Sequence, residues 1–180
     1  MATATVSAPT PVRKGAVKFK GSPMTLLGPE LKAGVRAPDF DALGTDLSAV
    51  SLSSFKGKPV LISATPSLDT PVCDAQAKRF NDEAATLPAV IVLNISMDLP
   101  FAQRRWCGAS GVDRIKTLSD HRDASFGMAY GTLIQELRLL ARAVFVIDAA
   151  GTLRYVEYVP EVTAHPNYDA ALAAVRQFVK

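Results

Sequence analysis

Three short runs of nearly uninterrupted apolar residues dominate the pattern of the chain. They cover residues 59–63, 90–96 and 143–147. Runs of this length without alternation are typical of strands in the centre of a sheet that is covered on both faces. Residues 153–158 alternate instead, and the turn sequence at 148–151 joins them to the third run. This last pair predicts a β-hairpin.

Helical periodicity separates these predicted strands. Apolar positions recur near a 3.6-residue period from 71 to about 86, with Gln76 as the exception. A second helix is predicted to begin at Pro100, because proline suits the first helical position, and to end at Gly108. A third helix is predicted at 168–178. The alternation of strands and helices indicates an α/β domain with a mixed central β-sheet flanked by helices.

The N-terminal region differs in composition from the rest. Residues 1–15 are rich in Ala, Thr and Pro and contain no acidic residue, which predicts a flexible N-terminal extension. They lack the continuous apolar stretch of a secretory signal, and a weak organelle-type presequence is the alternative. Residues 16–180 are expected to form a single domain that opens with a β-hairpin at 17–27. Residues 36–58 are predicted to be loop with short extended pieces.

Composition narrows the functional class. The 180 residues suit one domain, and the net charge of +3 comes from scattered rather than clustered basic residues, which argues against a nucleic-acid partner. No apolar run approaches the roughly 18 residues that span a bilayer, so we expect no membrane segment. Two cysteines without a signal sequence indicate functional thiols in a reducing, cytoplasmic location rather than a disulfide scaffold.

Cys73 lies in a sequence that favours its thiolate form. In the segment PSLDTPVC, which ends at Cys73, Thr70 is a suitable N-cap and Pro71 a suitable first helical residue. The sulfur would then lie beside the free amides of the first turn and the positive end of the helix dipole. The Thr70 hydroxyl would lie close enough to hydrogen-bond the sulfur or a bound oxygen. The alternative is a buried cysteine that only packs in the core.

The second thiol, Cys107, has the opposite setting. It is predicted at the C-terminal end of the second helix, where the dipole disfavours a thiolate and Arg104 and Arg105 offset this only in part. The spacing excludes a Cys-x-x-Cys motif but leaves open both a disulfide and an inert Cys107. No metal is expected, because only His121 and His165 could join the cysteines and no ligand spacing repeats. Neither histidine lies in a motif for Cys–His hydrolysis, so both are interpreted as surface residues.

With these residues identified, the chain resembles the thiol peroxidase branch of the peroxiredoxins, the atypical 2-Cys class. The pattern Pro66-x-x-x-Thr70-x-x-Cys73 is the active-site signature of peroxiredoxins, and the resemblance continues in order from about Val17 to the C-terminus. Further matching segments are DLPFAQ at 98–103, WCG at 106–108, LARAV at 140–144 and PNYDAAL at 166–172.

The resemblance implies a thioredoxin-like fold with an N-terminal β-hairpin, usually a homodimer, without cofactor or metal. It implies that Cys73 is the peroxidatic and Cys107 the resolving cysteine, joined as an intramolecular disulfide during turnover. It further implies that Thr70 and Arg142 hold the thiolate and the peroxide, and that Pro66 shields the pocket. Arg142 as an ordinary surface ion-pair partner is the alternative. Hydroperoxides, organic ones in particular, would be the substrates and thioredoxin the reductant.

Two departures from the family pattern and one competing function remain. Asp74 follows Cys73 where the family more often has a small residue, and residues 135–138 replace a turn that usually contains glycine. Because the two cysteines lie on different predicted helices, we expect at least one segment to unwind when the disulfide forms. A redox sensor or regulatory protein, switched by the same disulfide, is the alternative to a peroxidase that turns over.

Overall fold

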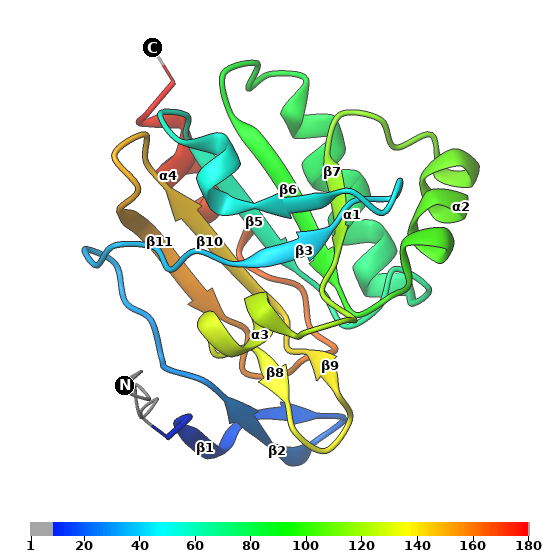
Figure 1. The fold of residues 1–180 in the computed structure, drawn as a ribbon, viewed down its shortest axis with the longest axis vertical. Coiled ribbons are helices and arrows are strands. Elements are labelled where there is room, and N and C mark those ends of the chain that lie inside the picture. The colour runs from blue at the N-terminus through cyan, green and yellow to red at the C-terminus, as the bar shows by residue number, and fades with distance from the viewer. Residues whose placement is uncertain (1–8, 180) are drawn as a thin grey trace, which may run out of the picture.

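The computed structural model describes residues 9–179 of the chain. Within them, a mixed sheet of seven strands forms the centre of the domain (Figure 1). Strands β5, β6 and β7 are parallel, and the others join at both sides in antiparallel order, which confirms the predicted mixed sheet. In sheet order, the strands are β11 (Leu153–Tyr158), β10 (Ala143–Ile147), β5 (Val60–Ala64), β6 (Ile91–Ser96), β7 (Lys116–Ser119), β3 (Asp41–Leu43) and β4 (Ala49–Ser51).

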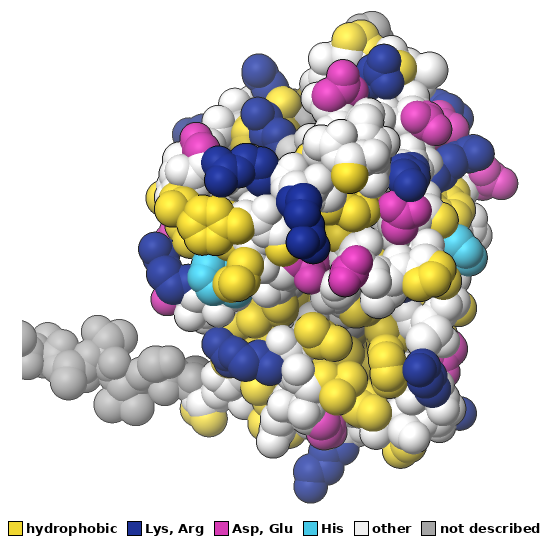
Figure 2. Space-filling model, turned by 90° about the vertical axis from the view of Figure 1, so that its right-hand side faces the viewer, with side chains coloured by type: hydrophobic (Ala, Val, Ile, Leu, Met, Phe, Trp, Pro, Cys, Tyr) yellow, Lys and Arg dark blue, Asp and Glu magenta, His cyan; other side chains and the backbone are white. Residues whose placement is uncertain are grey.

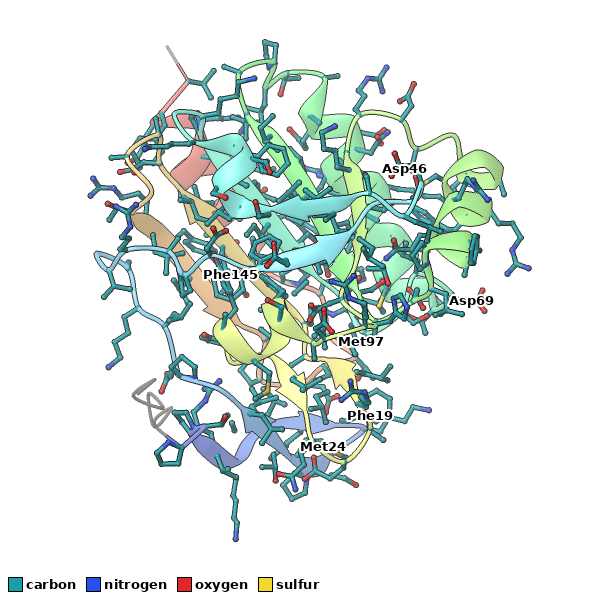
Figure 3. The ribbon with its side chains drawn as sticks, viewed as in Figure 1. Phe19, Met24, Asp46, Asp69, Met97 and Phe145 are labelled. Atoms are coloured by element: carbon teal, nitrogen blue, oxygen red, sulfur yellow. The ribbon has the colours of Figure 1, made fainter. Side chains whose placement is uncertain are left out.

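Helices cover both faces of this sheet, and this is why strands β5, β6 and β10 are largely apolar without alternation. The helices are α1 (Pro71–Ala84), α2 (Pro100–Ser110), α3 (Ser125–Ala129) and α4 (Tyr168–Arg176), with a 3₁₀ turn at Leu52–Phe55. Val144 packs in the core beneath α1 and α4. Its neighbour Phe145 enters the core beside α3 (Figure 3). Consecutive residues of one strand therefore enter different cores, and no alternation is left in the sequence.

A second, smaller sheet carries the N-terminal hairpin. Its strands, in order, are β1 (Val12–Phe19), β2 (Ser22–Leu27), β8 (Leu133–Ile134) and β9 (Leu139–Leu140). The predicted hairpin is thus confirmed, and it pairs with the chain that leads into β10. Its core includes Ala141, the residue just before Arg142. Arg142 consequently lies where the two sheets meet.

Two predicted boundaries are wrong. Strand β1 begins at Val12, so residues 12–15 belong to the hairpin rather than to an extension, and residues 1–8 lie outside the described part. Helix α2 continues through Gly108 to Ser110. It ends at Gly111, whose φ of 64° is the left-handed conformation that glycine adopts without strain, and whose amide donates to the Cys107 carbonyl.

The side of the molecule that carries α2 shows Lys and Arg side chains scattered among acidic ones, with hydrophobic side chains between them (Figure 2). Two of the exposed large apolar residues, Leu99 and Phe101, are at the start of α2. Across residues 9–179, no helix combines the length and the hydropathy needed to cross a bilayer.

A buried carboxyl group anchors α3 to the end of β7. Asp120 accepts hydrogen bonds from the amides of Phe126 at 2.9 Å and Gly127 at 2.8 Å, and it is only 2% exposed. Burial raises the pKa of Asp120 from 3.8 to about 6, although the two amide hydrogen bonds oppose this shift. Asp120 therefore binds a proton more tightly in the folded chain than in the unfolded chain.

We expect this proton to make stability depend on pH. Between about pH 4 and about pH 6 the folded state holds the proton that the unfolded state has lost, so the free energy of unfolding falls as the pH rises. Asp120→Asn has no titrating group at this position. Relative to this variant, the free energy of unfolding of the wild type should fall by up to about 3 kcal/mol across this window. Urea denaturation of both proteins at several pH values measures it. A difference that stays constant, or grows with pH, contradicts the assignment.

Candidate active site

Cys73 occupies the first turn of α1 as the sequence predicts. Thr70 is the N-cap residue in extended conformation, Pro71 is the first residue of the helix, and Cys73 is the third. The Cys73 side chain is completely buried. Its sulfur lies at the positive end of the α1 dipole, which favours a negative charge there.

The side chain of Arg142 lies directly against this sulfur. Its Nη2 atom is 3.2 Å from Cys73 Sγ, its Nε atom donates to the carbonyl of Val162 at 2.9 Å, and Nη1 donates to Oε1 of Gln76. Arg142 is only 1% exposed. The structure therefore excludes the interpretation of Arg142 as a surface ion-pair partner and places it in the same site as Cys73.

The surroundings of Arg142 require a compensating negative charge. Among the described residues, no carboxylate forms an ion pair with this guanidinium. A buried, unpaired cation is strongly unfavourable, because arginine cannot lose its proton within the accessible pH range. Cys73 is the one ionisable group that hydrogen-bonds Arg142. The guanidinium and the positive end of the α1 dipole thus both lie where they would stabilise a negative charge on the Cys73 sulfur.

Gln76 holds Arg142 from the opposite side and was not recognised in the sequence as a site residue. It is completely buried, and its Nε2 atom donates to Ser63 Oγ at 2.7 Å. The polar chain continues from Ser63 to Asn94 at 3.1 Å and from Asn94 to Thr65 at 3.3 Å. The available signal was a polar residue on the apolar face of a predicted helix, three positions after the reactive cysteine.

The loop before Cys73 is fastened to the end of β6. The carboxylate of Asp98 accepts from Ser67 Oγ at 2.7 Å and from the Leu68 amide at 2.8 Å. Pro66 is buried at the start of this loop, whereas Asp69 lies at the edge of the molecule (Figure 3). The loop is therefore held in place independently of the cysteine.

Thr70 is in the expected position, but its hydroxyl has a different partner. Oγ1 of Thr70 donates to the carbonyl of Ser67 at 2.9 Å and does not cap a helix amide. Within residues 9–179, no hydrogen bond links this hydroxyl to Cys73. Because the Thr70 proton is used by Ser67, the free lone pairs of Oγ1 can accept a hydrogen bond from a ligand.

The resolving candidate, Cys107, lies apart from this site. Its sulfur is partly exposed and 3.4 Å from Thr117 Oγ1 on β7, and both thiols are free. Arg142 immediately precedes β10, and β5 and β6 lie between β10 and β7. The two sulfurs have separate partners, Arg142 for Cys73 and Thr117 for Cys107. The structure therefore does not bring Cys107 into contact with Cys73.

The loop that replaces a glycine-containing turn is also well fixed. Arg138 takes the left-handed conformation, with φ of 51°, that glycine would adopt more easily. The carboxylate of Glu136 accepts the amide hydrogen of Thr25 at 2.9 and 3.0 Å, which ties the loop to the hairpin. The approach to Arg142 is thus ordered without glycine.

The two histidines lie outside the Cys73 site. His165 is exposed and bonded to the Tyr168 hydroxyl, and His121 is half-buried and bonded to Ser119. In the part of the chain that the structure describes, no group of three or more His, Cys, Asp or Glu side chains could hold a metal ion.

Comparison with known proteins agrees with this geometry. The model of the redoxin family matches residues 32–172. The thiol peroxidase of Halalkalibacterium halodurans is 60% identical over 160 residues, covering 89% of this chain and 96% of that protein. The thiol peroxidase of Bacillus subtilis is 57% identical over 164 residues, covering 91% and 98%.

Solved structures agree in turn. A peroxiredoxin-like protein from Aquifex aeolicus has a TM-score of 0.86 and 41% identity, covering 93% of this chain and 99% of that one. A thiol peroxidase from Chromobacterium violaceum, 22% identical with a TM-score of 0.81, supports the fold alone. The chain belongs to the redoxin family, with the thioredoxin-like fold that its signature predicts. Within that family it is one of the thiol peroxidases, which are oxidoreductases of the peroxiredoxin type.

We expect Gln76 to control the reactivity of Cys73 through Arg142. Gln76→Leu has similar volume but removes the acceptor for Nη1, which frees the guanidinium to turn away from the sulfur. The rate constant of Cys73 with a hydroperoxide should fall about tenfold, the size expected for one lost hydrogen bond to a charged group. Stopped-flow measurement of the first oxidation step checks this.

Gln103→Leu is the matched control. Gln103 is an equally buried glutamine, on α2, and it donates to Ser96 Oγ and to the Leu118 carbonyl without contacting Arg142. Both variants should lose stability in urea, but only Gln76→Leu should slow the oxidation of Cys73. Equal rates for the two variants would show that Gln76 is merely structural.

Proposed function

We propose that this chain reduces hydroperoxides, both organic hydroperoxides and hydrogen peroxide, and that Cys73 is the peroxidatic cysteine. The observation that carries the proposal is the contact between Cys73 Sγ and Arg142 Nη2 at 3.2 Å, in a site where Arg142 has no carboxylate partner among the described residues. A thiolate in this position is the nucleophile that the chemistry needs.

In the first step, the Cys73 thiolate attacks the terminal oxygen of the hydroperoxide. An S–O bond forms and the O–O bond breaks, so that sulfur loses two electrons and the peroxide gains them. The products are Cys73 sulfenic acid and an alkoxide, or hydroxide from hydrogen peroxide, which takes up a proton from water. Negative charge thus moves from sulfur to the leaving oxygen during the reaction.

Three residues are proposed to assist this step. Arg142 lies beside the sulfur, where its positive charge would stabilise the negative charge that develops along the O–O bond. Thr70 presents free lone pairs to the peroxide hydrogen, because its own proton is donated to Ser67. Pro66, buried at the base of the loop, shields the sulfur from water. Thr70 and Pro71 are exposed, so the peroxide is expected to enter from their side.

Cys107 is proposed to complete the oxidative half of the cycle. Its thiol condenses with the Cys73 sulfenic acid, which gives an intramolecular disulfide and one molecule of water. Thioredoxin, a dithiol reductant present in reducing compartments such as the cytoplasm, would then restore both thiols by exchange. We further propose a homodimer, for which the exposed Leu99 and Phe101 offer an apolar surface.

The test is the mass and thiol content of the reduced protein after one equivalent of cumene hydroperoxide. We expect loss of both thiols and a decrease of about two mass units, which corresponds to one disulfide. Cys107→Ser should stop at the sulfenic acid, about 16 mass units heavier, and Cys73→Ser should not react. Retention of both thiols in the wild type would refute the proposal.

Turnover separates this enzyme from a redox sensor that uses the same disulfide. With thioredoxin, thioredoxin reductase and NADPH present, a peroxidase consumes many equivalents of peroxide per chain. A sensor would be oxidised once and then consume no more.

A further inference from the structure

One hydrogen bond connects the two helices that carry the cysteines. Nε1 of Trp106, on α2, donates to Oδ1 of Asp74, on the first turn of α1, at 3.1 Å. The second carboxylate oxygen of Asp74 accepts from Lys78 at 2.9 Å on the same helix. The Asp74 carboxylate is thus directed to α2 and to its own helix.

The two partners of this bond are the direct neighbours of the two cysteines in the sequence. Asp74 follows Cys73, and Trp106 precedes Cys107. We propose that Asp74 and Trp106 are positioning residues, forming a latch that holds α2 against α1 and must open before Cys107 can reach Cys73. This inference rests on the proposed peroxidase function and adds to it the step that limits disulfide formation.

The geometry of a disulfide explains why the latch must open. A disulfide needs Cα atoms within about 7 Å. In this structure both thiols are free and have separate partners, Arg142 for Cys73 and Thr117 on β7 for Cys107. Cys107 must therefore leave Thr117 and move with its part of α2. Trp106 cannot keep its contact with Asp74 during this movement, because the indole belongs to the same helical turn as Cys107.

The other contacts of this part of α2 are of two kinds. Beyond Cys107, the amides of Gly111 and Val112 donate to the Cys107 carbonyl, which holds the end of α2 together but does not join it to α1. The Trp106 ring packs beside the buried core beneath α1 and α4. Among residues 9–179, the hydrogen bond from Trp106 to Asp74 is therefore the one polar side-chain contact that joins this part of α2 to α1.

The latch acts on the second chemical step only. In that step the Cys107 sulfur attacks the Cys73 sulfenic sulfur, an S–S bond forms, the S–O bond breaks, and the hydroxyl leaves as water with the proton from Cys107. A closed latch prolongs the life of the sulfenic acid. During this time a second peroxide can oxidise it to sulfinic acid, which Cys107 cannot reverse.

Rapid-quench mass spectrometry of the full-length protein tests the proposal. After a peroxide pulse, two species are followed over time: the sulfenic acid, about 16 mass units heavier than the reduced protein, and the disulfide, about two units lighter. Trp106→Phe keeps the ring but removes the donor, and Asp74→Ala removes the acceptor. Both should form the disulfide about three- to tenfold faster than wild type, as expected for one partly exposed hydrogen bond, with an unchanged rate of sulfenic acid formation.

Two further variants act as controls. Lys78→Met removes the other partner of Asp74 and alters the charge near the site, but it leaves the Trp106 bond intact, so disulfide formation should keep its wild-type rate. Asp74→Asn retains an acceptor oxygen and should fall between wild type and Asp74→Ala. The faster variants should also give less sulfinic acid at high peroxide concentration.

The outcomes distinguish this proposal from the one on which it rests. If the wild type forms neither sulfenic acid nor disulfide, the proposed function fails and the latch fails with it. If the wild type forms the disulfide, but Trp106→Phe and Asp74→Ala form it no faster, the function stands and the latch is refuted. The fluorescence of Trp106, the only tryptophan, should also change in step with disulfide formation in the wild type.

Discussion

The buried contact between Arg142 and Cys73 is the interaction on which the site depends. A guanidinium that is 1% exposed and lacks a carboxylate partner in the described structure can be accommodated only with a negative charge beside it. The helix dipole of α1 alone would provide a weaker preference for thiolate, because its effect is equivalent to a fraction of a charge. Stabilisation of a negative charge at this sulfur would therefore depend on tertiary contacts as well as on helix α1.

The surrounding elements hold the side chains of Arg142 and Cys73 in contact. Arg142 stands between β9 and β10, where the hairpin sheet joins the main sheet, and Gln76 supports it from α1. Asp98 fixes the loop before Cys73 from the end of β6, and Glu136 fixes the chain before Arg142 to the hairpin. Two buried groups from distant parts of the sequence meet because each has an independent anchor.

The sequence predicted what is encoded locally and missed what depends on tertiary contacts. Apolar runs identified β5, β6 and β10, and the Thr70–Pro71 cap located Cys73 correctly. The elements between α2 and Arg142 could not be predicted from the sequence. They are β7, α3, β8 and β9, each five residues or shorter, and segments of this length carry little periodicity. Gly108 was chosen over Gly111 as the end of α2, since only the fold reveals which glycine has positive φ.

The same distinction applies to the site residues. Gln76 appeared only as an exception to a pattern, because its partners Ser63 and Arg142 are remote in sequence. Likewise, the orientation of Asp74 toward Trp106 could not be derived from helical geometry in one segment alone. Roles that depend on contacts between side chains of two different helices or strands could be identified only in the structure.

The absence of a carboxylate beside Arg142 has a consequence for the oxidised enzyme. In the proposed cycle, conversion of a Cys73 thiolate to a neutral sulfenic acid would remove the negative charge and leave Arg142, among the described residues, without an anionic partner in a low-dielectric interior. The first turn of α1 would then be held less firmly in the proposed sulfenic acid state, which is the state that Cys107 is proposed to approach. In the proposed cycle, the step that oxidises the Cys73 sulfur would therefore also weaken the contact with Arg142 that holds this sulfur in place.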